Sequence, residues 1–364
     1  MFLPIFINFL NFVGLPLQKP KTKLYSVYIF SVSALYVTLT GISLYSTLVI
    51  RFLASKTLNA FFYILIYVVI NIIDLLATLQ NGYFKRYSID KLLITMEDLL
   101  GFVNRNVGRQ TERKLIRMQK FDFILIQMTM IPWLIFMTYW VGHLVTFKKF
   151  MVFGMVYYNH YLTAMEVMKI FMILQLLKHL MCEHNRQLFK TLSTKQVLSE
   201  KELHSFLKHY DKLIDCVGLF NESFGLQILG TSIVTPLIMV QGIFFSLSQV
   251  SFPSVIRTVV VNVATLTKFT LFLVLSFMIA APSQRIAREF QNTQRICNTF
   301  RSNTKHNKEV QRMLQLLSLQ LQNRKTCISA AGFFDADYTM ILNMLVSTVS
   351  YVIVFLQINA KIPN

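Results

Sequence analysis

Long apolar stretches alternate with shorter charged segments along this chain. A helix needs ~20 apolar residues to cross a bilayer, and runs of that length occur at about 24–50, 59–79, 121–141, 151–177, 224–250, 254–281 and 338–358. Over the 364 residues, 54% are hydrophobic, 15% are charged and the mean hydropathy is +0.51. A soluble domain of this length has a more polar composition. The pattern predicts an all-α polytopic membrane protein with seven transmembrane helices.

The connections between some of these spans have helical patterns of their own. Between spans four and five, apolar residues recur at three- and four-residue spacing from Leu203 to Phe220, which is typical of an amphipathic helix. Residues 286–303 continue span six, and Glu309–Gln322 forms a further helix. We expect these helices to pack into a cytoplasmic core within one subunit or between subunits, with Leu203, Leu207, Leu314 and Leu317 buried. The alternative is that the helices lie flat on the membrane.

The positive charge is distributed unevenly between the two sides of the predicted membrane. The net charge is +19, and 28 of the 36 lysines and arginines lie in the N-terminal tail and the second, fourth and sixth connections. Basic residues favour the cytoplasmic side, so we expect a cytoplasmic N-terminus and an extracellular C-terminus. The charge therefore reflects topology, and we expect no nucleic acid partner.

This orientation is the reverse of that of G-protein-coupled receptors, and the chain lacks their Asp-Arg-Tyr and Asn-Pro-x-x-Tyr motifs. A metabotropic seven-span receptor is thus a poor alternative.

The four cysteines fall in segments predicted to be cytoplasmic, where disulfides are rare. The sequon at Asn221 falls on the same side, so we expect it to remain unmodified.

The end of span seven carries a short motif, Ser350-Tyr351, five apolar residues, then Gln357-Ile358. It resembles the Thr-Tyr and Gln-Phe pairs, five residues apart, of the insect gustatory receptors. Two of the four named positions differ, since serine replaces threonine and isoleucine replaces phenylalanine. The number of spans, the inverted topology and the segments SIDKLLITMEDLL and GFFDADYTMILNMLVS extend the resemblance over nearly the whole chain.

The resemblance implies a ligand-gated cation channel of the plasma membrane, surrounded by membrane lipid and assembled as a homotetramer or as a heterotetramer with related receptors. It divides the single domain 1–364 into spans one to six with their extensions (24–281), anchor helices (282–337) and a pore-lining span seven (338–358). A small tastant would open the channel. Because the outer halves of the spans lack an acidic cluster, we expect a bitter or noxious compound. The residues themselves also leave a transporter-like protein open, although no internal repeat is evident.

Span seven has a polar stripe that suits a pore. On a projection of ~100° per residue, five positions fall within roughly 80° of one another: Asn343, Ser347, Ser350, Val354 and Gln357. The alternative is that the stripe joins helices within one subunit. We expect Gln357 and Ile358 to form the outer mouth and gate. Tyr351, just off the stripe, would hydrogen-bond a neighbouring helix.

Candidate ligand residues are the aromatic and polar side chains in the outer halves of spans two to six. Such a set suits a small, neutral, partly apolar molecule, either a bitter plant toxin or a sugar that stacks on the rings. Aromatic residues also favour membrane interfaces for solvation alone. The candidates are Tyr63, Tyr67, Trp133, Tyr157, His160, Tyr161, Gln241, Asn262 and Thr265.

Three charged residues, Asp74, Glu166 and Lys268, share a depth in spans two, four and six. Because an unpaired charge within a membrane is costly, they form a candidate ion-pair network, and Glu166 can also reach Lys169 one turn away. The alternative is that they lie at the cytoplasmic interface.

No pattern favours an enzyme, a cofactor or a metal site. His179, Cys182 and His184 lack the His-Glu-x-x-His spacing of zinc sites and fall on a predicted extension of span four. Asp335 and Asp337 directly precede span seven, and we expect them to cap that helix.

Overall fold

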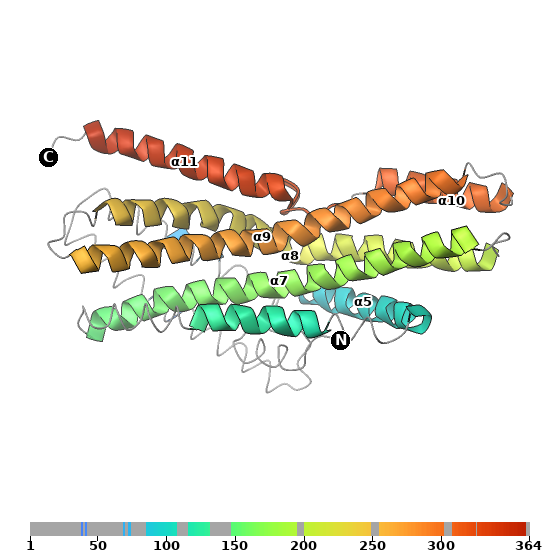
Figure 1. Cartoon of the computed structure of the whole chain (residues 1–364), viewed down its shortest axis with the longest axis horizontal. Coiled ribbons are helices and arrows are strands. Elements are labelled where there is room, and N and C mark those ends of the chain that lie inside the picture. Colours follow the sequence, from blue (N-terminus) through green and yellow to red (C-terminus); the bar gives the residue numbers. More distant parts are fainter. Residues whose placement is uncertain are drawn as a thin grey trace.

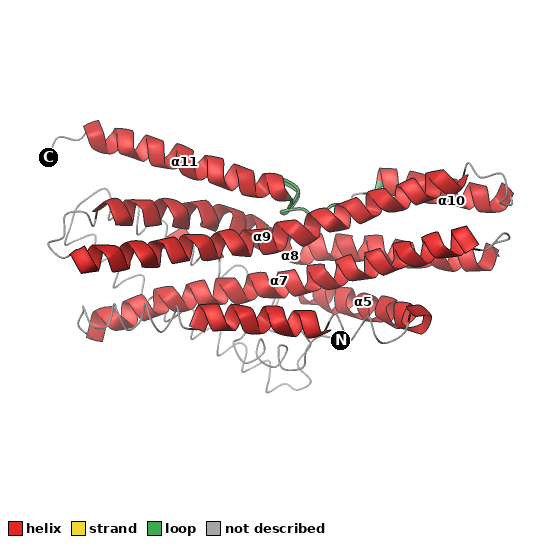
Figure 2. Ribbon diagram, viewed as in Figure 1, coloured by secondary structure: helices red, strands yellow, loops and turns green. Residues whose placement is uncertain are grey.

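The structure is a bundle of helices. A computed structural model describes residues 85–107, 116–131, 147–194, 200–248, 255–301, 308–324 and 326–361, and a few isolated helical positions: Thr38, Gly41, Val68, Val69, Ile72 and Ile73. The named helices are α5 (Arg86–Val107), α7 (Phe147–Thr194), α8 (Glu200–Ser248), α9 (Val255–Arg301), α10 (Lys308–Asn323) and α11 (Tyr338–Lys361). Residues 116–131 are also helical. Within these ranges the β contacts amount to one isolated bridge, between Ser329 and Asp335, and Figure 2 accordingly shows helices and loops without a strand in the described ranges.

Three helices are much longer than a membrane requires. α7, α8 and α9 have 48, 49 and 47 residues, and at ~1.5 Å per residue each is about 70 Å long, more than twice the ~30 Å hydrocarbon thickness. The predicted extensions of spans four and six are therefore confirmed. The amphipathic helix from Leu203 to Phe220 is also confirmed, as the first part of α8. Figure 1 shows α5 and α10 beside one end of these long helices and α11 beside the other.

The end of the bundle that carries α5 and α10 has its own core. α10 packs on α8 and α9, and α5 packs on α7 and α8. Leu203, Leu314 and Leu317 are buried, which confirms the prediction for these three, and Leu207 is only partly buried against the core. These contacts lie within one chain. We call this region, formed by α5, α10 and the adjoining parts of α7, α8 and α9, the inner bundle.

A buried polar network joins the three long helices inside the inner bundle. The Asn185 amide of α7 donates to the Glu289 carbonyl and carboxylate of α9, both at 2.9 Å. Thr293 of α9 donates to Asn185 Oδ1 at 2.7 Å, and the Tyr210 hydroxyl of α8 bonds the Thr293 hydroxyl. Buried polar groups that bond one another fix a single arrangement of the helices around them.

An aromatic cluster lies beside this network. The His184 ring of α7 contacts the rings of Phe102, Phe206 and Tyr210, and Phe102 stacks on His209 with centroids 3.7 Å apart. Burial, together with a smaller effect of the nearby His209, lowers the pKa of His184 to about 3. The imidazole is therefore neutral at physiological pH, as its apolar surroundings require.

The other part of the molecule exposes a large apolar surface. In the helix at 116–131, Phe121, Ile124, Leu125, Met128 and Ile131 are all exposed at three- and four-residue spacing. Exposure of this kind marks a surface that faces lipid or another protein. Among the described residues, Glu202–Ile243 and Thr265–Arg301 have the length and composition of membrane spans, and Tyr338–Val354 is a shorter apolar helix.

Candidate pore helix and ligand-contact residues

α11 presents three different faces. Met340, Ile341, Met344 and Thr348 are buried on the side that packs against α8 and α9. The opposite side is apolar and exposed, with Leu342, Val346, Val349, Ile353 and Leu356 each at least 46% accessible. An apolar exposed face next to a packed one shows that α11 meets lipid or a further protein surface outside its own chain.

The polar stripe occupies the third face. Asn343, Ser350, Val354 and Gln357 are exposed and Ser347 is partly exposed, while the side chain of Ile358 lies outside the described residues. On the helical projection the stripe lies ~115° from the buried face. The Ser350 hydroxyl donates to its own helix, to the Val346 carbonyl at 2.9 Å. The stripe is thus turned away from α8 and α9, which disfavours the alternative that it joins helices within one subunit.

Tyr351 lies toward the packed side of α11 on the same projection, yet its side chain is 55% exposed. α11 runs apart from the other helices toward its C-terminal end in the view of Figure 1. A hydrogen bond from Tyr351 to a neighbouring helix therefore remains a prediction, and the exposure of the side chain favours a helix of another subunit.

The start of α11 is fixed by a cap and a tight turn. The Asp337 carboxylate accepts the Thr339 backbone N–H at 2.9 Å and also its hydroxyl, which confirms the predicted cap at this residue. Asp335 instead pairs with Ser329 in the isolated bridge. The turn between them carries Ala331 at φ 51° and Gly332 at φ 85°, a left-handed conformation that glycine adopts readily and alanine only at a cost.

The structure separates the candidate ligand residues into two groups. His160 and Tyr161 of α7 are both buried and point in different directions. His160 packs edge-on against Phe272 of α9, with ring centroids 5.5 Å apart. The Tyr161 hydroxyl donates to the Gln127 amide oxygen at 2.9 Å, and the Gln127 amide nitrogen lies 3.2 Å from the Met165 sulfur. Gln127 was not among the predicted residues, although a lone amide in an apolar span was the signal that singled out Gln357.

The second group lies between α8 and α9. Gln241 is partly buried, and a methyl group of Thr265 lies against Gly242, next to it. Asn262 is exposed and does not join them. Tyr63, Tyr67 and Trp133 lie outside the described residues, as does the side chain of Tyr157. Contact of these residues with ligand therefore stays a prediction.

The three charged residues are only partly placed. Glu166 pairs with Lys169, and both side chains are buried, as expected for residues one turn apart. The Lys169 ammonium also lies 5.9 Å from the centre of the Phe224 ring of α8. Lys268 is partly buried on α9, within electrostatic range of His160. Asp74 lies outside the described residues, so the three-membered network stays a prediction.

Over the described parts of the chain, no three histidine, cysteine or acidic side chains gather as metal ligands would. His179 and His184 lie on the part of α7 that extends span four, and none of the four cysteines, all of them in the described ranges, forms a disulfide.

Comparison with known proteins assigns the family. The sequence model of the 7tm chemosensory receptor family matches residues 6–362. The chain belongs to this family. A Drosophila melanogaster protein named gustatory receptor 28b is 26% identical over 156 residues, which cover 42% of this chain and 33% of that protein. The match thus spans about a third of the length of that relative.

The fold of this chemosensory receptor is similar to that of a solved insect receptor. The olfactory receptor OR5 from Machilis hrabei superposes with a TM-score of 0.72 at 14% identity, over 97% of each chain. The same receptor in complex with eugenol gives a TM-score of 0.64 at 14% identity, over 97% of this chain and 96% of that one. The predicted all-α, seven-span membrane fold is confirmed. The family is one of receptors, in agreement with the expectation that the chain is not an enzyme.

Proposed function

We propose that this chemosensory receptor is a ligand-gated cation channel of the plasma membrane, with four subunits arranged so that the four α11 helices surround a central pore. The subunits are copies of this chain or of this chain and related receptors. A small, neutral, partly apolar tastant, bitter or noxious in class, opens the pore. The membrane-receptor family and the likeness to an olfactory receptor support the first part of this proposal.

The polar stripe of α11 is the observation that carries the proposal. A row of exposed polar side chains in lipid would lack hydrogen-bond partners, at a cost in free energy. Water in a pore supplies such partners, and four-fold symmetry brings four stripes together around one axis. The exposed apolar face of α11 then meets lipid or the adjacent subunit, so each of its three faces has a suitable environment.

The ligand site is proposed around Tyr161 and Gln127, whose side chains bond one another, with His160 facing Phe272 on the next face of α7. These residues combine aromatic rings, an amide and a thioether neighbour, Met165, which suits a compact molecule with one or two polar groups. The related olfactory receptor in complex with eugenol supports a small-molecule ligand.

Current recorded from the purified protein in a lipid bilayer, with no accessory protein present, tests this function. We expect a panel of bitter and noxious compounds to include one that evokes cation current. Saturable uptake or exchange of a compound without channel openings would instead indicate a transporter. The absence of both would contradict the proposal.

Two substitutions test whether α11 lines the proposed pore. Ile358→Ala removes an apolar side chain from the proposed outer gate and should raise ligand-independent current, because water then enters the closed pore. Gln357→Glu adds a ring of negative charge and should increase divalent over monovalent permeability. Single-channel recordings with unchanged basal activity in the first variant and unchanged selectivity in the second would exclude α11 from the conduction path.

A further inference from the structure

One short stretch of α8, residues 221–230, contacts both the turn before α11 and the region around the second span. On one side the Asn221 amide donates to the Cys327 carbonyl at 2.9 Å, and its oxygen accepts the Ser329 N–H at 2.9 Å. A single side chain thus satisfies a backbone donor and a backbone acceptor of the turn. Both bonds are lost if the turn shifts along α8, since each depends on direction as well as distance.

Gly225, one turn farther along α8, lets the same turn approach closely. A Cβ atom at this position would lie 2.8 Å from the Ala331 backbone nitrogen and 3.1 Å from the Ser329 carbonyl oxygen. Backbone atoms cannot swing aside as the end of a side chain can, so the turn rests directly on α8. Asn221 and Gly225 lie about 40° apart on the helical projection and form one face.

The turn itself is well bonded. The Ala330 N–H donates to the Phe334 carbonyl at 2.9 Å, and the Ala336 N–H donates to the Ile328 carbonyl at 2.8 Å. Since the Asp337 cap follows directly, no unbonded segment separates the turn from α11. A displacement of the turn therefore reaches the first turn of α11.

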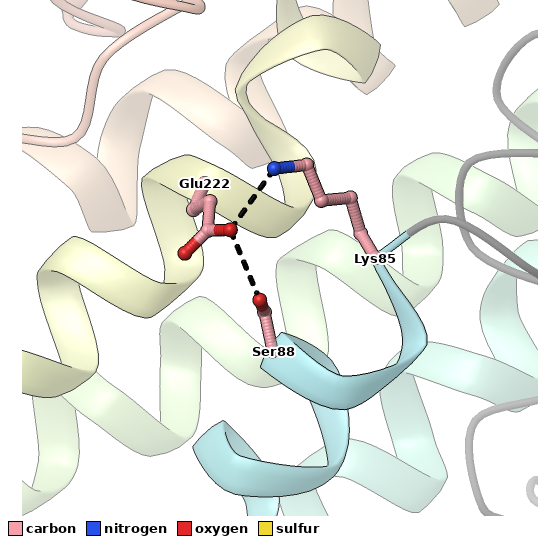
Figure 3. A network of polar contacts seen from close by, with 3 residues as sticks. All are labelled: Lys85, Ser88 and Glu222. Carbon is pink, nitrogen blue, oxygen red and sulfur yellow. Dashed lines mark hydrogen bonds and ion pairs between the residues drawn. The ribbon is translucent and has the colours of Figure 1, made fainter.

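The neighbouring face of residues 221–230 contacts the start of α5 and Ile73 of the second span. The Glu222 carboxylate oxygen Oε1 accepts the Lys85 ammonium at 2.9 Å and the Ser88 hydroxyl at 3.1 Å, as Figure 3 shows. The hydrogen bond from Lys85 lowers the pKa of Glu222 below its usual range. Farther along, Gly230 lies against the Ile73 side chain, where a Cβ atom would come within 2.4 Å. Glu222 and Gly230 lie about 80° apart on the projection.

We propose that residues 221–230 of α8 are a mechanical link between the second span with the start of α5 and the root of α11, with Asn221 and Glu222 as positioning residues. A movement of the second span shifts Ile73, Lys85 and Ser88 against α8. Asn221 and Gly225 then pass that shift to the turn at 327–337. The link rests on the proposed function for its role in gating, because it gives Ile73 of the second span and the start of α5 a route to the pore helix.

Hydrogen–deuterium exchange on the full chain in lipid nanodiscs tests the link itself. Asn221→Ala should raise amide exchange in residues 327–340 about tenfold, since two hydrogen bonds are lost. Gly225→Ala should do the same by steric displacement. Gly218→Ala is the matched control, because a Cβ atom on that α8 glycine meets nothing within 4 Å. Asn221→Asp keeps an acceptor for the Ser329 N–H and should give a smaller increase.

The decisive variant is Lys85→Glu, because Lys85 bonds Glu222 but belongs to the other side of the link. It should raise exchange in residues 327–340 about threefold, in keeping with a partly exposed ion pair, and the swap Lys85→Glu with Glu222→Lys should restore the wild-type rate. Exchange that rises around Lys85 alone, with the turn unchanged, would overturn the proposal. An unchanged turn in both Asn221→Ala and Gly225→Ala would do so as well.

Single-channel recording without ligand separates the link from the proposed function. If the wild-type protein conducts, Asn221→Ala and Lys85→Glu should both change the basal open probability, and Gly218→Ala should leave it unchanged. Coupled exchange in a protein that never conducts would support the link and contradict the channel. Conduction that none of the link variants alters would contradict the role of the link in gating.

Discussion

The inner bundle and α11 differ in where their polar side chains find hydrogen-bond partners. In the inner bundle Asn185, Tyr210, Thr293 and Glu289 bond one another across α7, α8 and α9. On α11 the polar stripe is exposed. Its side chains bond no other described helix, and the Ser350 hydroxyl bonds a carbonyl of α11 itself. The polar network of the inner bundle is thus satisfied within one chain, whereas the stripe of α11 is exposed and open to water, lipid or another protein surface.

This difference separates stability from function. A side chain that is buried and bonded within its own subunit contributes mainly to folding. A side chain on the exposed stripe contributes little to folding and is available for conduction. Substitutions in the two regions should therefore change different quantities, and the predictions below run from the largest expected effect to the smallest.

The largest effect is expected where α10 meets the core. Leu314→Ala should lower the free energy of unfolding by about 2–5 kcal/mol, because it leaves a cavity under a fully buried side chain. Leu316→Ala, two residues away and 52% exposed, should change it by less than about 0.5 kcal/mol. Denaturation of the purified protein in detergent measures both. Equal effects would show that α10 does not pack as described.

Acid should destabilise the inner bundle through His184. Its folded-state pKa is lowered to about 3, against ~6.5 in the unfolded chain. The neutral ring therefore contributes fully to the free energy of unfolding above pH 6.5, and this contribution is lost as the pH falls toward 3. The loss amounts to about 2 kcal/mol between pH 7 and pH 5. His184→Phe should remove this part of the pH dependence, since a phenyl ring suits the same aromatic cluster and carries no proton. A variant that keeps the wild-type pH dependence would show that His184 is accessible to water.

Loss of one hydroxyl from the buried network should have a smaller effect. Thr293→Val removes the bonds to Asn185 and Tyr210 at nearly constant volume, and should cost about 1–2 kcal/mol because those partners stay buried. The control is Thr270→Val, an exposed threonine on α9 that bonds its own helix at the Leu266 carbonyl. We expect its melting temperature in detergent to match that of the wild type. A Thr293→Val protein as stable as this control would mean that the network adds nothing to stability.

The smallest effect on stability, and the clearest on conduction, is expected in the stripe of α11. Ser350→Ala should change the free energy of unfolding by less than about 0.5 kcal/mol, because the side chain is exposed and its hydroxyl bonds its own helix. It should nevertheless lower single-channel conductance, since it removes a hydroxyl from the lining of the proposed pore. Thr348→Val, on the buried face, should leave conductance unchanged and lower stability. The reverse pattern would assign the pore to the other face.

Periodicity in the sequence was sufficient to predict α7 to α11, since a helix that faces lipid or a core repeats its apolar residues at a spacing set by local geometry alone. It did not single out α5 (Arg86–Val107) as a helix. The extensions of spans four and six, the helix at Glu309–Gln322 and the Asp337 cap are all local patterns, and the structure has each of them. Composition predicted the membrane for a related reason, because the solvent around a helix selects its side chains.

Contacts between distant segments could not be obtained in that way. The sequence identifies Asn221 only as part of a sequon that we expect to remain unmodified. In the structure its amide bonds the backbone of a turn 106 and 108 residues away. Glu222 bonds Lys85 across 137 residues, and Gln127 meets Tyr161 of another helix. The sequence by itself determined which residues form helices and in what surroundings. Which faces of those helices meet was decided only by the tertiary structure, because side-chain packing and hydrogen bonds between distant segments depend on the rotation and depth of each helix, which no local spacing specifies.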